Sequence, residues 1–245
     1  MLGTNPVRSV TETDMLEVQE IFATIQGEGP FAGVPAVFIR LAGCNLRCTY
    51  CDTDFESSYR QSNLRTPEQA AQRAMDIAGK ACSLIVITGG EPFRQPIGLA
   101  LLLHIFTIRE FHVQVETAGT LWHARFDSLS HLIQKMPGVP VHHYWSIVCS
   151  PKTPKIHSAV ELNALAFKYI LQADDVSPLD GLPMRSTQDK ERTAPVWRSP
   201  RKSLVYVQPC ADGERTEENT RAAVDVCTEH GYRLCIQQHK VLGLP

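Results

Sequence analysis

Three cysteines are grouped in one short segment of the chain. Cys44, Cys48 and Cys51 have C-x3-C-x2-C spacing. Cysteine thiolates bind iron–sulfur clusters, and a [4Fe–4S] cluster is normally held by four of them. Three thiolates without an evident fourth would leave one iron open, and an open metal position is where chemistry can occur. The spacing therefore predicts a reactive iron–sulfur cluster.

A structural zinc site is the alternative use of these thiols. Zinc would need a histidine beside the three cysteines, and zinc sites usually pair their cysteines in two separated C-x2-C units. Disulfide bonds do not explain the group, because three cysteines cannot all pair with one another. The remaining cysteines stand in apolar contexts that are typical of small core residues. They are Cys82, Cys149, Cys210, Cys227 and Cys235.

The elements around the cysteines would place them at the end of a buried strand. Residues 36–41 form an apolar run that stops at the cysteine loop and contains Arg40. A charged side chain is rarely buried without a partner, so Arg40 either reaches solvent or faces an anion in a cavity, and we favour the anion. A Gln-Gly-Glu-Gly turn follows the strand predicted for residues 20–25 and supplies the polar side chains of Gln26 and Glu28.

A second glycine-rich turn follows the next apolar run. Residues 84–87 predict a buried strand, and Thr-Gly-Gly-Glu-Pro comes directly after it. Gly89 and Gly90 carry no Cβ atom, so a ligand can approach their backbone closely. By itself this motif is weak evidence for a binding site.

The rest of the chain alternates strands and helices. The best-marked helix starts with Thr66 as N-cap, Pro67 at the first helical position and Gln69 completing a capping box. Helices are predicted for residues 67–78, 96–109, 127–136, 160–165 and 216–230, the last capped by Thr216 and stopped by Gly231. Further strands are predicted for residues 112–116, 144–148, 167–171, 204–207 and 233–237. This repetition predicts an α/β fold with a parallel sheet, which carries its chemistry at the strands' C-terminal ends.

Length and composition are those of one soluble globular domain, with 245 residues of which 43% are hydrophobic and 20% charged. We expect residues 1–14 to be disordered and residues 15–245 to form the domain, with a long, mobile surface loop at about 174–203. The net charge of −2 gives no general attraction to nucleic acid or to a membrane surface. No apolar run reaches the about 20 residues of a membrane helix. Eight cysteines without a secretory leader favour a cytoplasmic location.

Two sets of motifs resemble known families. The cysteine spacing, Tyr50 within it and the Gly-Gly-Glu-Pro segment resemble the radical S-adenosylmethionine (radical SAM) superfamily, in which SAM chelates the fourth iron of the cluster. A more specific set, which extends from about residue 20 to residue 245, resembles the 7-carboxy-7-deazaguanine synthase family. Its motifs are Phe22-x2-Ile25-Gln26-Gly27-Glu28-Gly29, Cys51-Asp52-Thr53, Glu116-Thr117-x-Gly119, Ser150-Pro151-Lys152, Gln208-Pro209 and His239-Lys240-x-Leu242.

This resemblance implies a modified, partial (β/α) barrel and a lyase. The reaction that it implies converts 6-carboxy-5,6,7,8-tetrahydropterin to 7-carboxy-7-deazaguanine with loss of ammonia, in the biosynthesis of queuosine and related 7-deazapurines (preQ0). The cofactors that it implies are a [4Fe–4S] cluster, SAM and Mg²⁺. A radical derived from SAM would remove a hydrogen from C6 of the pterin. The implied partners are a second copy of the chain and an electron donor such as flavodoxin or ferredoxin.

The resemblance also implies a role for individual residues. Cys44, Cys48 and Cys51 would bind the cluster, and Thr53 would bind Mg²⁺. The residues implied for SAM are Tyr50, Asp52, Gly89, Gly90, Glu91, Gly119, Ser150, Pro151, Lys152 and Gln208. The residues implied for the pterin are Ile25, Gln26, Gly27, Glu28, Arg40, Thr117, His239 and Pro245. Pro245 would act through a terminal carboxylate, in a tail held by its apolar side chains.

The sequence also departs from the family pattern. Gln238 stands where threonine is frequent, Ala118 where asparagine or serine is, and the cysteine loop lacks an insertion that some members carry. None of these positions is a thiolate, so the departures affect substrate geometry and not the class of reaction. A glycyl-radical-enzyme activase is the rival radical SAM enzyme, because it shares the cysteine loop and a similar length. It has no evident use for the Gln-Gly-Glu-Gly turn.

Overall fold

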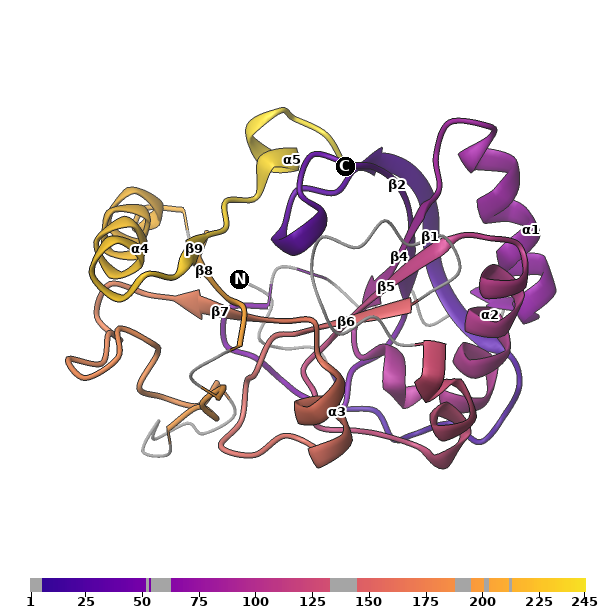
Figure 1. Ribbon diagram of the computed structural model, residues 1–245, viewed down its shortest axis with the longest axis horizontal. Coiled ribbons are helices and arrows are strands. Elements are labelled where there is room, and N and C mark those ends of the chain that lie inside the picture. Colours follow the sequence, from indigo (N-terminus) through magenta and orange to yellow (C-terminus); the bar gives the residue numbers. More distant parts are fainter. Residues whose placement is uncertain are drawn as a thin grey trace.

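The computed structural model describes residues 6–51, 53, 63–132, 145–187, 195–200, 203–211 and 213–245. In this described part, nine strands form one sheet in the order β3-β1-β2-β4-β5-β6-β7-β8-β9 (Figure 1). The strands are β1 (Leu16–Ile25), β2 (Pro35–Leu41), β3 (Leu64–Arg65), β4 (Leu84–Gly89), β5 (His112–Thr117), β6 (Trp145–Cys149), β7 (Ala166–Leu171), β8 (Val205–Pro209) and β9 (Arg233–Leu234). The α-helices are α1 (Pro67–Ala78), α2 (Pro96–Ile108), α3 (Ser158–Asn163), α4 (Thr216–His230) and α5 (Gln238–Val241). The 3-10 helices are η1 (Gly29–Phe31), η3 (Pro92–Arg94) and η4 (Ala124–Leu132).

The sheet is mostly parallel. β1 pairs antiparallel with β2 and β3, whereas each neighbouring pair from β2 to β9 is parallel. Among the described strands, β3 and β9 lie at the two edges and do not pair with each other. The predicted α/β fold with a single domain is confirmed. Because the two described edge strands do not pair, the sheet is open, as expected for a partial (β/α) barrel.

The register between β2 and β4 brings the cysteine loop beside the Gly-Gly turn. Both strands are apolar and largely buried, as expected for parallel strands inside a sheet that helices cover. Arg40 lies opposite Thr88, and Leu41 lies opposite Gly89. Parallel strands end at the same edge of the sheet, so the two motifs leave the sheet side by side.

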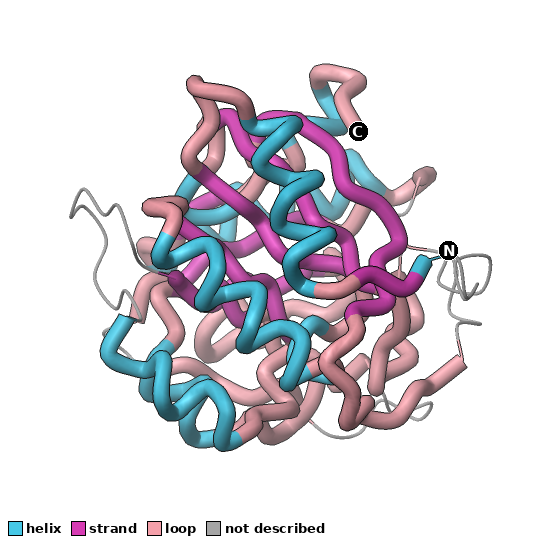
Figure 2. Tube along the Cα trace, turned by 90° about the vertical axis from the view of Figure 1, so that its right-hand side faces the viewer, coloured by secondary structure: helices cyan, strands magenta, loops and turns pink. Residues whose placement is uncertain are grey.

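Helices α1 and α2 cover one face of the sheet (Figure 2). The Thr66 hydroxyl accepts a hydrogen bond from the Gln69 backbone N–H, and the Gln69 side chain accepts one from the Thr66 N–H. This capping box confirms the predicted start of α1. Small alanines on α1 and larger apolar side chains on α2 pack into the main core. They are Ala70, Ala71, Ala74, Leu99, Leu102, Leu103 and Phe106.

Several element boundaries differ from the prediction. β1 begins at Leu16, four residues before the predicted strand, because Leu16 and Val18 are part of the core. Of the predicted terminal strand, residues 233–237, only Arg233 and Leu234 form a strand (β9), and α5 begins after it at Gln238. A 3-10 helix, η4, takes the place of the helix predicted for residues 127–136. Residues 133–136 and Tyr144, at the start of another predicted strand, lie outside the described residues.

The N-terminal segment contacts the cysteine loop. We expected residues 1–14 to be disordered, and residues 1–5 lie outside the described residues. Val7, however, forms a β-bridge with Cys44, and the Arg8 N–H donates to the Cys44 carbonyl at 2.8 Å. The Thr11 N–H donates to the Arg94 carbonyl at 2.9 Å. Residues 7–11 therefore help to hold the loop that carries the first cysteine.

The described part of the long loop is also held against the body of the protein. Val176 forms a β-bridge with Pro183. The hydroxyl of Tyr232, the residue before β9, donates to the Asp180 carbonyl at 3.0 Å. The Tyr169 hydroxyl in β7 donates to the Trp197 carbonyl at 3.1 Å. The prediction of a long surface loop did not include these contacts. No helix among the described residues is long and apolar enough to cross a membrane.

Candidate active site

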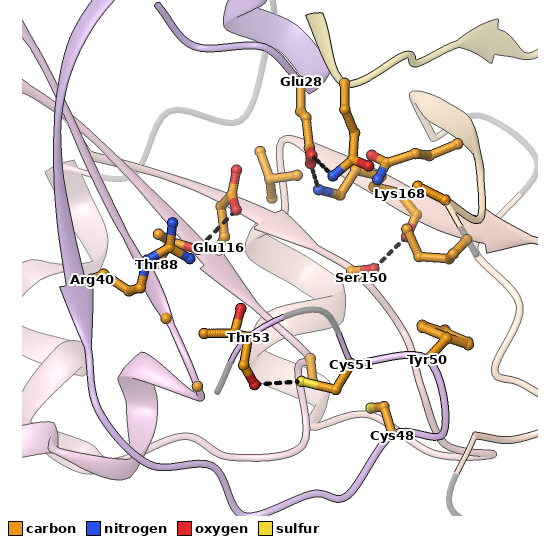
Figure 3. A pocket seen from close by; sticks show the side chains of 18 of the residues that line it. Glu28, Arg40, Cys48, Tyr50, Cys51, Thr53, Thr88, Glu116, Ser150 and Lys168 are labelled. Atoms are coloured by element: carbon orange, nitrogen blue, oxygen red, sulfur yellow. Dashed lines mark hydrogen bonds and ion pairs between the residues drawn. The ribbon is translucent and has the colours of Figure 1, made fainter. Parts of the chain in front are cut away.

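One cavity of about 650 Å³ lies at the C-terminal ends of the parallel strands. Figure 3 shows three groups of side chains around it: Cys48, Cys51, Tyr50 and Thr53 on one side, Arg40, Thr88 and Glu116 on another, and Glu28 with Lys168 on a third. Most of the residues that the sequence indicated line it. They are Gln26, Glu28, Arg40, Cys44, Cys48, Tyr50, Cys51, Thr53, Gly89, Gly90, Thr117, Ser150, Lys152, Gln208, His239 and Pro245.

The remaining indicated residues do not line the cavity. Glu91, Gly119, Pro151, Ile25 and Gly27 lie outside the set of lining residues. Asp52 lies outside the described residues. For Glu91 and Gly27 the structure shows contacts that support the cavity from behind, and these are described below.

The three cysteines of the motif lie on one loop, and none of them forms a disulfide bond within the described part of the chain. The Leu46 N–H donates to the Cys44 sulfur at 3.4 Å, and the Cys51 N–H donates to the Cys48 carbonyl at 3.3 Å. The Asn45 side chain anchors the loop by donating to the Thr120 hydroxyl at 2.9 Å. Burial and, to a smaller extent, the charge of Glu91 raise the pKa of the Cys44 thiol to about 12.

The donor set fits a cluster better than a single ion. Among the described residues, no three His, Cys, Asp or Glu side chains lie close enough together to hold one metal ion. The thiolates of a [4Fe–4S] cluster bind different irons, so they must line one cavity but need not converge on one point. Cys44, Cys48 and Cys51 meet this requirement.

The two glycines of the second motif allow the turn after β4 to approach the cysteine loop. The Gly90 N–H donates to the Leu41 carbonyl at 3.0 Å, and the Glu91 N–H donates to the Gly43 carbonyl at 3.0 Å. A Cβ atom at Gly90 would lie 1.9 Å from the Gly43 carbonyl oxygen. We expected the absence of Cβ atoms at Gly89 and Gly90 to admit a ligand. In the structure it allows the turn after β4 to pack directly on the cysteine loop.

Glu91 supports the cavity wall from behind. Its side chain is fully buried and accepts hydrogen bonds from the Thr117 hydroxyl at 2.7 Å, the Ala118 N–H at 2.8 Å and the Phe93 N–H at 3.0 Å. Burial raises the pKa of Glu91, and these hydrogen bonds only partly offset that effect. The carboxyl group therefore fixes the end of β5, where Thr117 enters the cavity.

Lys152 brings an amino group to the cysteine side of the cavity. Its Nζ donates to the Ser150 hydroxyl at 2.6 Å and lies 5.5 Å from the centre of the Tyr50 ring. The Ser150 hydroxyl donates in turn to the Lys168 carbonyl at 2.8 Å. Burial lowers the pKa of Lys152, although the nearby Cys48 acts in the opposite direction. Tyr50, Ser150 and Lys152 are thus brought together as the motifs indicated.

Glu116 places a carboxylate in the middle of the cavity wall. Its Oε1 accepts hydrogen bonds from the side-chain amides of Gln26 at 3.2 Å and Gln114 at 2.9 Å, and its Oε2 accepts one from the Thr88 hydroxyl at 3.0 Å. Sequence reasoning quoted Glu116 within a motif but gave it no role. Its position directly before Thr117, at the end of a predicted strand, was the signal that could have identified it.

Arg40 faces the cavity and has a partner of its own. Its Nε donates to the Glu20 carboxylate at 2.6 Å, and its guanidinium lies 5.8 Å from the centre of the Phe22 ring. The side chain is about one-quarter exposed, and both Arg40 and Glu20 line the cavity. The partner that sequence reasoning required for Arg40 is therefore present within the chain.

The C-terminal residues close the cavity near the turn after β1. The Gln238 N–H donates to the Gly27 carbonyl at 3.2 Å, and the Thr24 hydroxyl donates to a Pro245 oxygen at 3.2 Å. We expected apolar side chains to hold this tail, but Val241 and Leu242 are 76% and 61% exposed. The tail is held by these polar contacts and by close packing of His239 on Gly27.

The comparisons with known proteins agree with this geometry. Residues 38–162 match the Radical SAM superfamily. The chain is 41% identical to the 7-carboxy-7-deazaguanine synthase of Rhodospirillum rubrum over the full length of both proteins, and 36% identical to that of Rickettsia prowazekii over all of this chain and 96% of the relative. The crystal structure of QueE from Escherichia coli has the same fold, with a TM-score of 0.59 and 23% identity over 91% of this chain and 94% of that one. With its thiols and its strand-end cavity, this chain therefore belongs to the 7-carboxy-7-deazaguanine synthase family of the radical SAM superfamily.

Proposed function

We propose that this protein converts 6-carboxy-5,6,7,8-tetrahydropterin to 7-carboxy-7-deazaguanine with loss of ammonia, in the biosynthesis of 7-deazapurines. The membership of the family supports this reaction. The observation that carries it in the structure is the shared cavity, which has three thiols on one side and a row of polar side chains on the others. SAM bound at the cluster and a molecule the size of a pterin would then contact each other inside this cavity.

The cluster and SAM would occupy the cysteine side. Cys44, Cys48 and Cys51 would hold the cluster, which when bound supplies the electron that cleaves SAM and so generates the radical for hydrogen removal. The residues of this chain position the two molecules and exclude water. Gly89, Gly90, Ser150, Lys152 and Gln208 line the same cavity as the cysteines and are our candidates for SAM contacts.

The pterin would occupy the side formed by β1, β2 and β5. Arg40 would bind its carboxylate. Glu20 occupies the Nε of Arg40, but a guanidinium has five N–H donors and can meet a second carboxylate with the others. Gln26 and Thr117 offer an amide and a hydroxyl to the ring, and Glu116 offers an acceptor for ring N–H groups. His239 and Pro245 would contact the pterin from the C-terminal tail.

Mg²⁺ would bind at Thr53. The Thr53 side chain lines the cavity two residues after Cys51. Mg²⁺ prefers hard oxygen ligands in octahedral geometry and keeps several waters. A lone hydroxyl would suffice if the pterin carboxylate supplies further oxygens, which would couple binding of the ion to binding of the substrate.

We further propose that the protein acts in the cytoplasm as a homodimer and receives electrons from a flavodoxin or ferredoxin. The family resemblance supports these proposals. Low-potential clusters need an electron donor of comparable potential, and the reaction offers no other source of the first electron.

Anaerobic reconstitution tests the function directly. The purified protein would be loaded with iron and sulfide, reduced, and incubated with SAM, Mg²⁺ and the carboxypterin. We expect 7-carboxy-7-deazaguanine, ammonia and 5′-deoxyadenosine to form. Cleavage of SAM without consumption of the pterin would reject the substrate but keep the radical SAM chemistry. A colourless protein that binds zinc and no cluster would reject both.

A further inference from the structure

The segment 174–187, called the arm below, is held by polar contacts within itself and with Arg198. The Asp175 carboxylate is nearly buried and accepts hydrogen bonds from the Arg185 Nε at 2.8 Å and the Met184 N–H at 3.2 Å. Arg198 forms an ion pair with Asp180 at 2.7 Å and donates from Nη1 to the Pro183 carbonyl at 2.8 Å. These contacts fold the segment back on itself, so its last residues have a defined position.

The end of this arm lies against the cysteine loop. Ser186 and Thr187 are 2% and 7% exposed. The Ser186 hydroxyl and the Thr187 N–H each donate to the Lys152 carbonyl at 3.0 Å. The Thr187 hydroxyl lies 3.3 Å from the Cys48 sulfur and 3.3 Å from the same Lys152 carbonyl. Sequence reasoning gave this residue no role.

The Lys152 carbonyl oxygen and the Cys48 sulfur both lie within hydrogen-bonding distance of the Thr187 hydroxyl. A carbonyl oxygen has two lone pairs, and at Lys152 two donors already occupy them. A third donor to that oxygen gains little. A thiolate carries negative charge, and hydrogen bonds to charged acceptors are about twice as strong as neutral ones. With a cluster bound, the Cys48 sulfur is therefore the better acceptor.

We propose that Thr187 is a positioning residue for the cluster, whose hydroxyl donates a hydrogen bond to the Cys48 thiolate and raises the cluster's reduction potential. Reduction adds one negative charge to the cluster and its ligands. A donor fixed on a ligand sulfur stabilises that more negative state more than the oxidised one, and hydrogen bonds to sulfur are among the factors that set cluster potentials. This part of the long loop would thereby influence how readily the cluster accepts an electron.

This inference rests on the cluster that the proposed function requires, but not on the pterin. It can therefore be tested without substrate, by EPR-monitored redox titration of the reconstituted protein. Thr187→Val keeps the shape and removes the hydroxyl, and Thr187→Ser keeps the hydroxyl. Ser177→Ala is the matched control, because it removes a hydroxyl of the same arm that accepts a hydrogen bond from the Leu179 N–H at 3.2 Å and does not compete for the Lys152 carbonyl.

We expect Thr187→Val to bind a full complement of iron and to be harder to reduce. At the wild-type midpoint potential its ratio of reduced to oxidised cluster should fall about tenfold, which corresponds to about 59 mV for a one-electron couple. Thr187→Ser should keep the wild-type potential, and Ser177→Ala should not change it. Equal potentials for Thr187→Val and wild type, or equal shifts for Thr187→Val and Ser177→Ala, would overturn the proposal.

A second measurement does not depend on the Thr187→Val variant. Electron–nuclear double resonance of the reduced wild-type cluster in D₂O should detect a strongly coupled exchangeable deuteron, and Thr187→Ser should retain it. Absence of such a deuteron in the wild-type protein would overturn the proposal even if Thr187→Val failed to fold or to load. Failure of the pterin reaction would leave both measurements unaffected.

Discussion

Lys168 and Glu28 form an ion pair inside the cavity, although they lie 140 residues apart in the sequence (Figure 3). Lys168 belongs to β7, and Glu28 to the turn after β1. Their side chains are 9% and 11% exposed, and the Gln237 amide donates to the second Glu28 oxygen at 2.8 Å. The pair therefore connects the first strand, the seventh strand and the C-terminal residues at the place where the substrate would bind.

Removing one partner of this pair should destabilise the fold. Lys168→Met leaves the Glu28 carboxylate buried without a cation, and breaking a buried pair in this way costs about 3–5 kcal/mol. The double variant Glu28→Gln/Lys168→Met carries no unpaired charge and should recover much of that loss. Urea unfolding of the three proteins measures the free energies. If Lys168→Met unfolded at the wild-type urea concentration, the pair would not contribute to stability.

The same pair should make stability depend on acid. Burial alone would raise the pKa of Glu28, but the Lys168 charge outweighs it and holds the pKa below the ordinary value of 4.5. The unfolded chain then binds more protons than the folded chain at low pH, so this contribution is present above about pH 4.5 and lost as pH falls through the folded-state pKa. Thermal unfolding from pH 6 to pH 3 should show a steeper loss for wild type than for the double variant. Parallel curves would contradict the assignment.

At alkaline pH the ion pair between Lys168 and Glu28 should not lose its contribution to stability up to about pH 9. Burial lowers the pKa of Lys168, but the Glu28 charge outweighs it and raises the pKa above the ordinary value of 10.5. The stability contributed by Lys168 is fully present below that value and is lost only when pH rises through the folded-state pKa. Thermal unfolding measured from pH 6 to pH 9 should therefore show no difference in pH dependence between wild type and the double variant.

The three motif cysteines should differ sharply from the others. Cys44→Ala, Cys48→Ala or Cys51→Ala should abolish cluster loading and SAM cleavage, because each removes one of the three iron ligands. Cys82→Ala and Cys227→Ala should have mild effects, since both side chains pack at the edge of the main core and do not line the cavity. Iron and sulfide analysis decides the matter. A fully loaded Cys48→Ala protein would end the cluster assignment.

The sequence predicted best what depends on neighbours in the chain. The start of α1 follows from Thr66 and Gln69, which satisfy each other's backbone groups three residues apart. The cysteine loop and the Gly-Gly turn were also found, because motifs of fixed spacing lie within single segments. Parallel strands then bring them together at one edge of the sheet.

What the sequence did not predict depends on partners far along the chain. Lys168 appeared as one residue of an apolar strand, and nothing near it indicated Glu28. The charged residues of 174–187 suggested a solvated loop, yet Asp175 and Arg185 pair with each other and fix Thr187 beside Cys48. Hydrophobic periodicity predicts which segments are buried, but it does not predict which polar groups meet across them.

Thr53→Ala should change the Mg²⁺ dependence of turnover more than the affinity for SAM. The hydroxyl is proposed to bind the ion, and the Gly-Gly turn and Lys152 are proposed to bind SAM. Activity would be titrated against Mg²⁺ in wild type, Thr53→Ala and Thr53→Ser, with the conservative variant keeping the oxygen ligand. A titration curve for Thr53→Ala that coincides with wild type would remove Thr53 from the metal site.

Gly27→Ala should displace the C-terminal tail from the cavity. A Cβ atom at position 27 would lie 2.3 Å from the His239 Nδ1 and 2.8 Å from the His239 backbone nitrogen, so the tail backbone would have to move. The movement would weaken the hydrogen bond from the Gln238 N–H to the Gly27 carbonyl and shift His239 and Pro245, the proposed pterin contacts on the tail. Iron content should not change, because in the described part of the chain no backbone hydrogen bond joins Gly27, Gln238, His239 or Pro245 to the cysteine loop.

The expected effect is on the pterin alone. Loss of one hydrogen bond to a charged group costs about 1.5–3 kcal/mol, so the pterin Kd should rise by about tenfold or more, at 1.4 kcal/mol per decade. Calorimetry of the cluster-loaded protein with SAM present measures it. The control is Val241→Ala, which alters an exposed tail residue without a clash and should bind the pterin like wild type. If Gly27→Ala kept the native pterin affinity, the tail would not contribute to pterin binding. The residues of β1, β2 and β5 that line the cavity would then have to recognise the substrate without it.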